Sequence, residues 1–111
     1  MSNDTPDSEA DHVIAAMEAA VDRLSDLRIA AARADTEAKR LQATALLEAR
    51  TLGFRSREER DAHAVLASAE AQEAAAICER TYRDTLTYIR TLQTRLDLIR
   101  TQIVSNRDLR V

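Results

Sequence analysis

Small and apolar residues recur in steps of three and four along two long stretches of the sequence. In the first stretch only Glu48 is polar, and its members are Ala10, Val13, Met17, Ala20, Leu24, Leu27, Ala31, Ala34, Ala38, Leu41, Ala45, Glu48 and Leu52. The members of the second stretch are Ala64, Ser68, Ala71, Ala75, Cys78, Tyr82, Thr85, Ile89, Leu92, Leu96, Ile99 and Ile103. Such a heptad pattern is typical of helices that pack along a single seam. It predicts two long helices with seams of the same period.

Gly53, the single glycine of the chain, lies between the two stretches. Glycine readily takes the left-handed conformation that closes a helix, and Ser56 with Glu59 has the spacing of a capping box at the next helix start. Thr5 and Pro6 provide a cap and a first-turn proline for the first helix. The predicted organisation is an acidic tail over 1–7 and one hairpin domain over 8–111, with a helix over 8–52, a turn over 53–56 and a helix over 57–105.

A short turn makes the two helices antiparallel neighbours, so that their residue numbers add to about 109 at each contact. This register places Ala31, Ala34 and Ala38 opposite Cys78, Ala75 and Ala71, and Met17, Val13 and Leu24 opposite Leu92, Leu96 and Thr85. The fold class is therefore all-α, with two long antiparallel helices that form a coiled-coil-like helical hairpin. We expect a close-packed alanine zone in its middle, where Leu at Ala34 or Ala75 would overpack, and larger apolar residues at the end where the termini lie.

Composition limits the core, because hydrophobic residues make up 45% of the 111 residues but many of them are alanine. Small helical assemblies of this kind usually gain stability by association. Four apolar residues near the end of the second helix lie off its seam: Leu86, Tyr88, Leu98 and Val104. We expect these residues to form an oligomer or partner interface in a homo-oligomer, the alternative being that they are singly exposed side chains.

Charge is distributed unevenly, although the net charge is only −3. Residues 1–26 hold seven acids and one arginine, whereas residues 80–111 hold seven arginines and three aspartates. Arginine binds phosphate in a bidentate manner, so we predict a nucleic-acid-binding set of Arg83, Arg90, Arg107 and Arg110. Arg95 and Arg100 are instead expected to pair with acids of the first helix, Asp7, Asp11 or Glu18. The alternative for all of these arginines is a solvated charged face.

Catalytic and ligand motifs are lacking in the sequence. His12, His63 and Cys78 are far apart in the predicted register, and the acids at 58, 59 and 61 suit the first turn of a helix better than a metal site. We therefore predict no enzymatic activity, no cofactor, no metal and no small-molecule substrate. One cysteine and the absence of a long apolar run favour a reduced, cytoplasmic protein without a membrane span.

The second predicted helix contains a pattern that carries a family resemblance. It consists of Val65, Leu66, Ala67, Ser68, Ala69, Glu70, Cys78, Tyr82, Leu86, Leu96, Asp97, Leu98, Ile99 and Arg100. Their order and spacing resemble the second long helix of the phage recombination-mediator proteins of the UvsY type, in which a Ser-initiated helix also follows a Gly-containing break. The resemblance covers about half of the chain, from about Arg50 to Arg100.

The resemblance implies a small helical oligomer that binds single-stranded DNA and helps to load a recombinase onto strands covered by single-strand-binding protein. The expected function is thus a non-enzymatic accessory or loading factor in DNA recombination or replication. The expected partners are a second copy of the chain, single-stranded DNA, and a recombinase or single-strand-binding protein. A coiled-coil adaptor, scaffold or inhibitor with no nucleic-acid role is the alternative.

Overall fold

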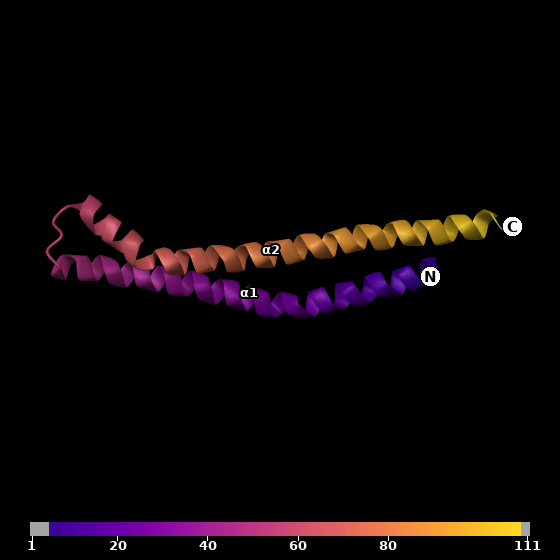
Figure 1. Cartoon of the computed structure of the whole chain (residues 1–111), viewed down its shortest axis with the longest axis horizontal. Coiled ribbons are helices and arrows are strands. Elements are labelled where there is room, and N and C mark those ends of the chain that lie inside the picture. The colour runs from indigo at the N-terminus through magenta and orange to yellow at the C-terminus, as the bar shows by residue number, and fades with distance from the viewer. Residues whose placement is uncertain (1–4, 110–111) are drawn as a thin grey trace. The chain divides into compact units, whose positions relative to one another are not determined.

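The computed structural model describes residues 5–109 and contains two helices, α1 (Pro6–Thr51) and α2 (Arg57–Leu109), joined by a short loop. No strand occurs within the described residues, so the predicted all-α hairpin fold is confirmed (Figure 1). Both helices are longer than predicted. α1 begins at Pro6 because the hydroxyl of Thr5 accepts a hydrogen bond from the Ser8 amide at 3.2 Å, which caps the helix before the proline. Residues 1–4 of the predicted acidic tail lie outside the described residues.

The loop that joins the helices contains Gly53, which closes the end of α1 in the left-handed conformation with φ = 86°. The Phe54 amide donates to the carbonyl of Ala49 at 3.1 Å and the Gly53 amide to that of Arg50 at 3.4 Å, which is the bonding pattern of a Schellman motif. α2 then starts at a serine cap, where the Ser56 hydroxyl accepts a hydrogen bond from the Glu59 amide at 3.1 Å. The stop and start signals around the single glycine are therefore confirmed.

Contacts divide the chain into two compact units, and we describe each separately. The terminal unit comprises residues 1–25 and 83–111, and the loop unit comprises residues 26–82. The core of the terminal unit is a buried cluster of Val13, Leu92, Leu96 and Ile99, against which Ala10, Ile14, Ala16, Met17 and Ile103 pack. This composition confirms the expectation of large apolar residues near the termini. The prediction of a single domain stays a prediction.

The loop unit has a seam of small side chains. Ala31, Ala38, Ala45 and Ala64 are buried at predicted seam positions. The prediction is wrong at the last two positions of the first stretch, because Glu48 is exposed and Leu52 is 62% exposed, while Ala49 is fully buried instead. A straight helix drifts relative to a strict heptad, and the step of four from Ala45 to Ala49 follows this drift and keeps a carboxylate in water.

The first turns of α2 are inclined to the rest of that helix (Figure 1). Ser68 is fully buried in this early part of α2, where its hydroxyl donates to the carbonyl of Ala64 at 2.7 Å and accepts from Gln72 at 2.9 Å. A serine bonded to the carbonyl four residues earlier favours a helix bend. This seam serine thus satisfies its own polar group and accounts for the local change in helix direction.

Candidate functional site

A row of arginines follows one side of α2 through the terminal unit, and we call it the cationic row. The positions from Arg83 to Val104 each come one residue after a seam residue, and Arg107 continues the same spacing, so the row lies beside the seam. The row consists of Arg83, Leu86, Arg90, Gln93, Asp97, Arg100, Val104 and Arg107. All of these residues except the half-buried Leu86 are exposed. Four cations and one acid therefore share one side of a continuous helix.

The expected interhelical ion pairs of Arg95 and Arg100 are not formed. Neither guanidinium is ion-paired within residues 5–109, and both residues are exposed. The ion pairs Lys39–Asp35 (2.9 Å) and Arg40–Glu37 (2.6 Å) instead join residues that are four and three positions apart within α1. Long exposed side chains gain little from pairing across a helix interface, because holding both in one geometry costs side-chain entropy.

Three of the four predicted nucleic-acid-binding residues can be placed on the cationic row. Arg83, Arg90 and Arg107 belong to it and are exposed, whereas Arg110 lies outside the described residues. Arg100 is a further member that sequence reasoning assigned to an ion pair instead. The sequence contains the signal for Arg100, since it comes one residue after the seam residue Ile99, as Arg83 and Arg90 follow their own seam residues.

The four residues predicted to form an apolar interface do not make one patch. Leu86 and Val104 lie in the cationic row and Leu86 is half-buried, whereas Tyr88 lies on the opposite side of the seam and Leu98 on the outer side of α2. Tyr88, Leu98 and Val104 are 47%, 62% and 56% exposed. Their exposure fits an interface, and their helical positions divide the four residues into two pairs, Leu86 with Val104 and Tyr88 with Leu98.

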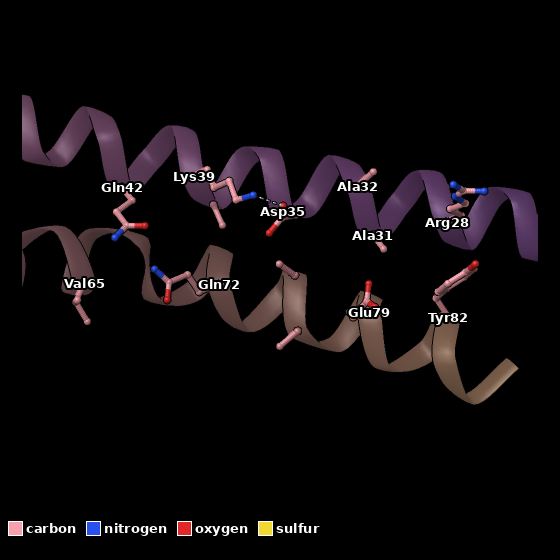
Figure 2. Close-up of a pocket in the computed structure, with 13 residues that line it drawn as sticks. Arg28, Ala31, Ala32, Asp35, Lys39, Gln42, Val65, Gln72, Glu79 and Tyr82 are labelled. Carbon is pink, nitrogen blue, oxygen red and sulfur yellow. Dashed lines mark ion pairs between the residues drawn. The ribbon is translucent and has the colours of Figure 1, made fainter. Parts of the chain in front are cut away.

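Open grooves flank the alanine seam of the loop unit, because short seam side chains do not fill the space under their longer neighbours. The larger groove has a volume of about 860 Å³ and is lined from α1 by Ala31 and Gln42 and from α2 by Gln72, Ala75 and Tyr82, among others. Figure 2 shows the side chains of Gln42 and Gln72 extending into the space between the helices. Within the predicted alanine zone Ala31 and Ala38 are buried, whereas Ala34, Ala71, Ala75 and Cys78 are only half-buried, so the zone is less closely packed than expected.

Five large aliphatic side chains near the loop are exposed, and the sequence reasoning missed them because it looked for apolar surface only near the C-terminus. These large side chains are Leu46, Leu47, Leu52, Val65 and Leu66, and Leu66 is the most exposed of them at 79%. All five belong to the loop unit. The signal was available in the sequence, since Leu47, Val65 and Leu66 lie off both seams.

No group of three or more His, Cys, Asp or Glu side chains within the described part of the chain could hold a metal ion. Cys78 is half-buried with a free thiol in the alanine seam, and His63 lies against the Phe54 ring at a centroid distance of 5.3 Å, with its buried Nε2 atom unbonded. Over residues 5–109, neither helix has an apolar stretch of the length needed to cross a membrane.

We also compared the chain with known proteins. The chain matched no family model, no characterised protein and no solved structure. The resemblance to phage recombination mediators therefore rests on the spacing of residues in α2, and function has to be argued from the surfaces described above.

Proposed function

We propose that this chain is a non-catalytic helical binding protein that holds single-stranded DNA along α2 as an accessory or loading factor in DNA recombination or replication. The cationic row is the observation that supports this proposal. Arg83, Arg90, Arg100 and Arg107 lie on one side of α2 over a length of about 36 Å, at about 1.5 Å per residue. An extended phosphate backbone is the ligand that a linear array of guanidinium groups matches.

The proposed mode of binding is contact with phosphates rather than with bases. The chain has three aromatic residues, and none of them lies in the cationic row: Phe54 contacts His63, Tyr82 is half-buried, and Tyr88 lies on the far side of the seam. Stacking platforms for bases are therefore lacking along the row. The protein should bind without sequence preference and with strong dependence on salt.

The test is a fluorescence-anisotropy titration of a labelled oligothymidine at several salt concentrations. With four phosphate contacts, the logarithm of the binding constant should fall with the logarithm of salt with a slope of about −3. The double variant Arg100→Gln/Arg107→Gln should reduce this slope by about 1.4. The matched control is Arg28→Gln/Arg33→Gln, which removes the same charge from exposed positions of α1 and should leave the slope unchanged. No binding at low salt would falsify the DNA-binding proposal.

A second candidate function, a protein-interaction adaptor, scaffold or inhibitor, is favoured by the aliphatic residues near the loop. Leu47 and Leu66 are 68% and 79% exposed, and large aliphatic side chains left in solvent can mark protein contacts. An adaptor would be indifferent to DNA but would form a stable protein complex that Leu47→Ser and Leu66→Ser weaken. Neighbouring genes for a recombinase or single-strand-binding protein would favour the first function, and genes for structural or cell-division proteins the second.

A further inference from the structure

The outer side of α2 in the terminal unit carries a second row, which has no charged member. Each of its positions comes two residues after a seam residue, so the row faces away from the buried core. This outer row consists of Thr87, Thr91, Thr94, Leu98, Thr101 and Ser105, all of which are exposed. It is bounded by Asp84 before it and Asp108 after it. The row between these two aspartates is therefore uncharged, on a chain in which 32% of residues are charged.

The threonines of the outer row already satisfy their hydroxyl groups. Thr87, Thr91, Thr94 and Thr101 each donate a hydrogen bond of 2.9–3.1 Å to the carbonyl four residues earlier. The methyl groups are then the parts of these side chains that need no polar partner. Another helix could cover these four threonines without leaving their hydroxyl donors unpaired, and an unpaired donor is the usual cost of burying polar surface.

Two pairs of residues flank the outer row, one pair on each of its edges. Arg90 and Asp97 lie seven residues apart on one edge, and Tyr88 and Arg95 lie seven residues apart on the other. A seven-residue spacing returns to the same edge of a heptad helix, so each edge presents two complementary groups in sequence. In an antiparallel dimer with two-fold symmetry, the first residue of such a pair lies opposite the second residue of the same pair on the other copy. An edge that carries two complementary residues is therefore complementary to itself.

We propose that the outer row of α2 is the interface of an antiparallel homodimer. Thr91 of one copy packs against Thr94 of the second copy, and Thr87 against Leu98, in layers repeated by the two-fold axis. This register places Arg90 opposite Asp97 of the second copy and Tyr88 opposite Arg95 of the second copy, each contact occurring twice. The flanking contacts are then two ion pairs and two cation–π contacts.

The charges select this arrangement over its nearest competitors. Sliding the two helices by one heptad places Asp97 opposite Asp97 and Arg95 opposite Arg95. A parallel pairing places Arg90 opposite Arg95. Each competitor thus creates like-charge contacts where the proposed register creates opposite ones.

A second copy of α2 is also a better partner than α1 of another molecule. The corresponding outer row of α1 in the terminal unit is His12, Ala15, Ala19 and Asp22, which is shorter than that of α2 and ends in an acid. Self-pairing through α2 further leaves Arg100 and Arg107 of both copies on the same edge of the dimer. The dimer does not depend on the proposed DNA binding, since a dimer that ignores DNA would overturn only the proposed function.

The first test is the oligomeric state of charge-swapped variants by sedimentation equilibrium. The wild-type chain should dimerise reversibly, and Arg90→Glu or Asp97→Arg should each raise the dissociation constant about tenfold, because each swap creates two like-charge contacts. The double variant Arg90→Glu/Asp97→Arg should return to the wild-type constant, whereas the control Arg33→Glu on α1 should not change it. A monomeric wild type, or a double variant no tighter than the singles, would overturn the proposed interface.

The second test is disulfide formation in a Cys78→Ala background, which reports the register. The pair Thr87→Cys/Leu98→Cys should yield covalent dimers on mild oxidation, because these residues face each other between copies. The matched pair Thr87→Cys/Ser105→Cys faces across copies only after a slide of one heptad and should remain uncrosslinked. Crosslinking of the matched pair alone would overturn the register.

Discussion

Val13 of α1 and Leu96 of α2 lie in the same buried cluster of the terminal unit, 83 positions apart in the sequence. Their numbers add to 109, as the antiparallel register predicts. Ala10 with Ile99 and Met17 with Leu92 obey the same relation in this cluster. The large apolar side chains that are buried are thus concentrated in the terminal unit.

Leu96→Ala should therefore be strongly destabilising. Leu96 is 6% exposed, and truncation of a core leucine costs about 2–5 kcal/mol of unfolding free energy. Urea unfolding followed by circular dichroism measures the change. Leu66→Ala is the matched control, since Leu66 is an exposed leucine of the same helix, and it should cost less than about 0.5 kcal/mol. Equal losses in the two variants would contradict the assigned core.

The seams and the hairpin could be predicted from the sequence because both depend on local rules. Heptad spacing reports which side of a helix is buried, and Gly53 with Ser56 marks the turn through backbone conformation and capping. The predicted seam was wrong at the end of α1, where the heptad spacing no longer matches the rotation of the helix. At Glu48 and Leu52 a strict heptad was extended to the end of α1, but helix drift and the cost of burying a carboxylate move the seam to Ala49.

The candidate surfaces were harder to predict, since they depend on what lies off the seam. Arg100 was assigned to an interhelical ion pair from proximity alone, although an exposed pair gains too little to fix two long side chains. Proximity in sequence also groups Leu86 and Val104 with Tyr88 and Leu98, but helical rotation places these two pairs on different sides of α2. Both points become clear when the rows on each side of the seam are read as well as the seam itself.

The alanine seam predicts unequal tolerance of larger side chains. Ala45→Leu should cost about 1–3 kcal/mol, because Ala45 is 2% exposed and lines none of the grooves described above. Ala75→Leu should cost less, since Ala75 is half-buried and lines the open groove of the loop unit. Thermal melts of the two variants give the comparison. A larger loss for Ala75→Leu would mean that the groove closes in solution.

The conformation of Gly53 predicts a penalty that is independent of packing. A Cβ atom added at Gly53 would meet no atom within 4 Å, yet φ = 86° is unfavourable for any side chain. Gly53→Ala should lower the unfolding free energy by about 1–2 kcal/mol. Gly53→Asn should lower it less, because asparagine tolerates the left-handed region better. Identical stabilities of the two variants in urea titrations would show that the loop changes its conformation.

The last prediction concerns acid titration within α1. The Arg40 guanidinium donates hydrogen bonds to the Glu37 carboxylate at 2.6 and 3.0 Å, and this bonding lowers the pKa of Glu37 below its ordinary value. A group whose folded pKa is lowered stabilises the fold above its unfolded pKa and loses this contribution as the pH falls through the folded pKa. Carbon-detected NMR titration should therefore give Glu37 a midpoint below the usual glutamate value, and Arg40→Ala should return it to that value. Because both side chains are exposed, added salt should also reduce the shift, and a midpoint insensitive to both changes would show that Arg40 is not its cause.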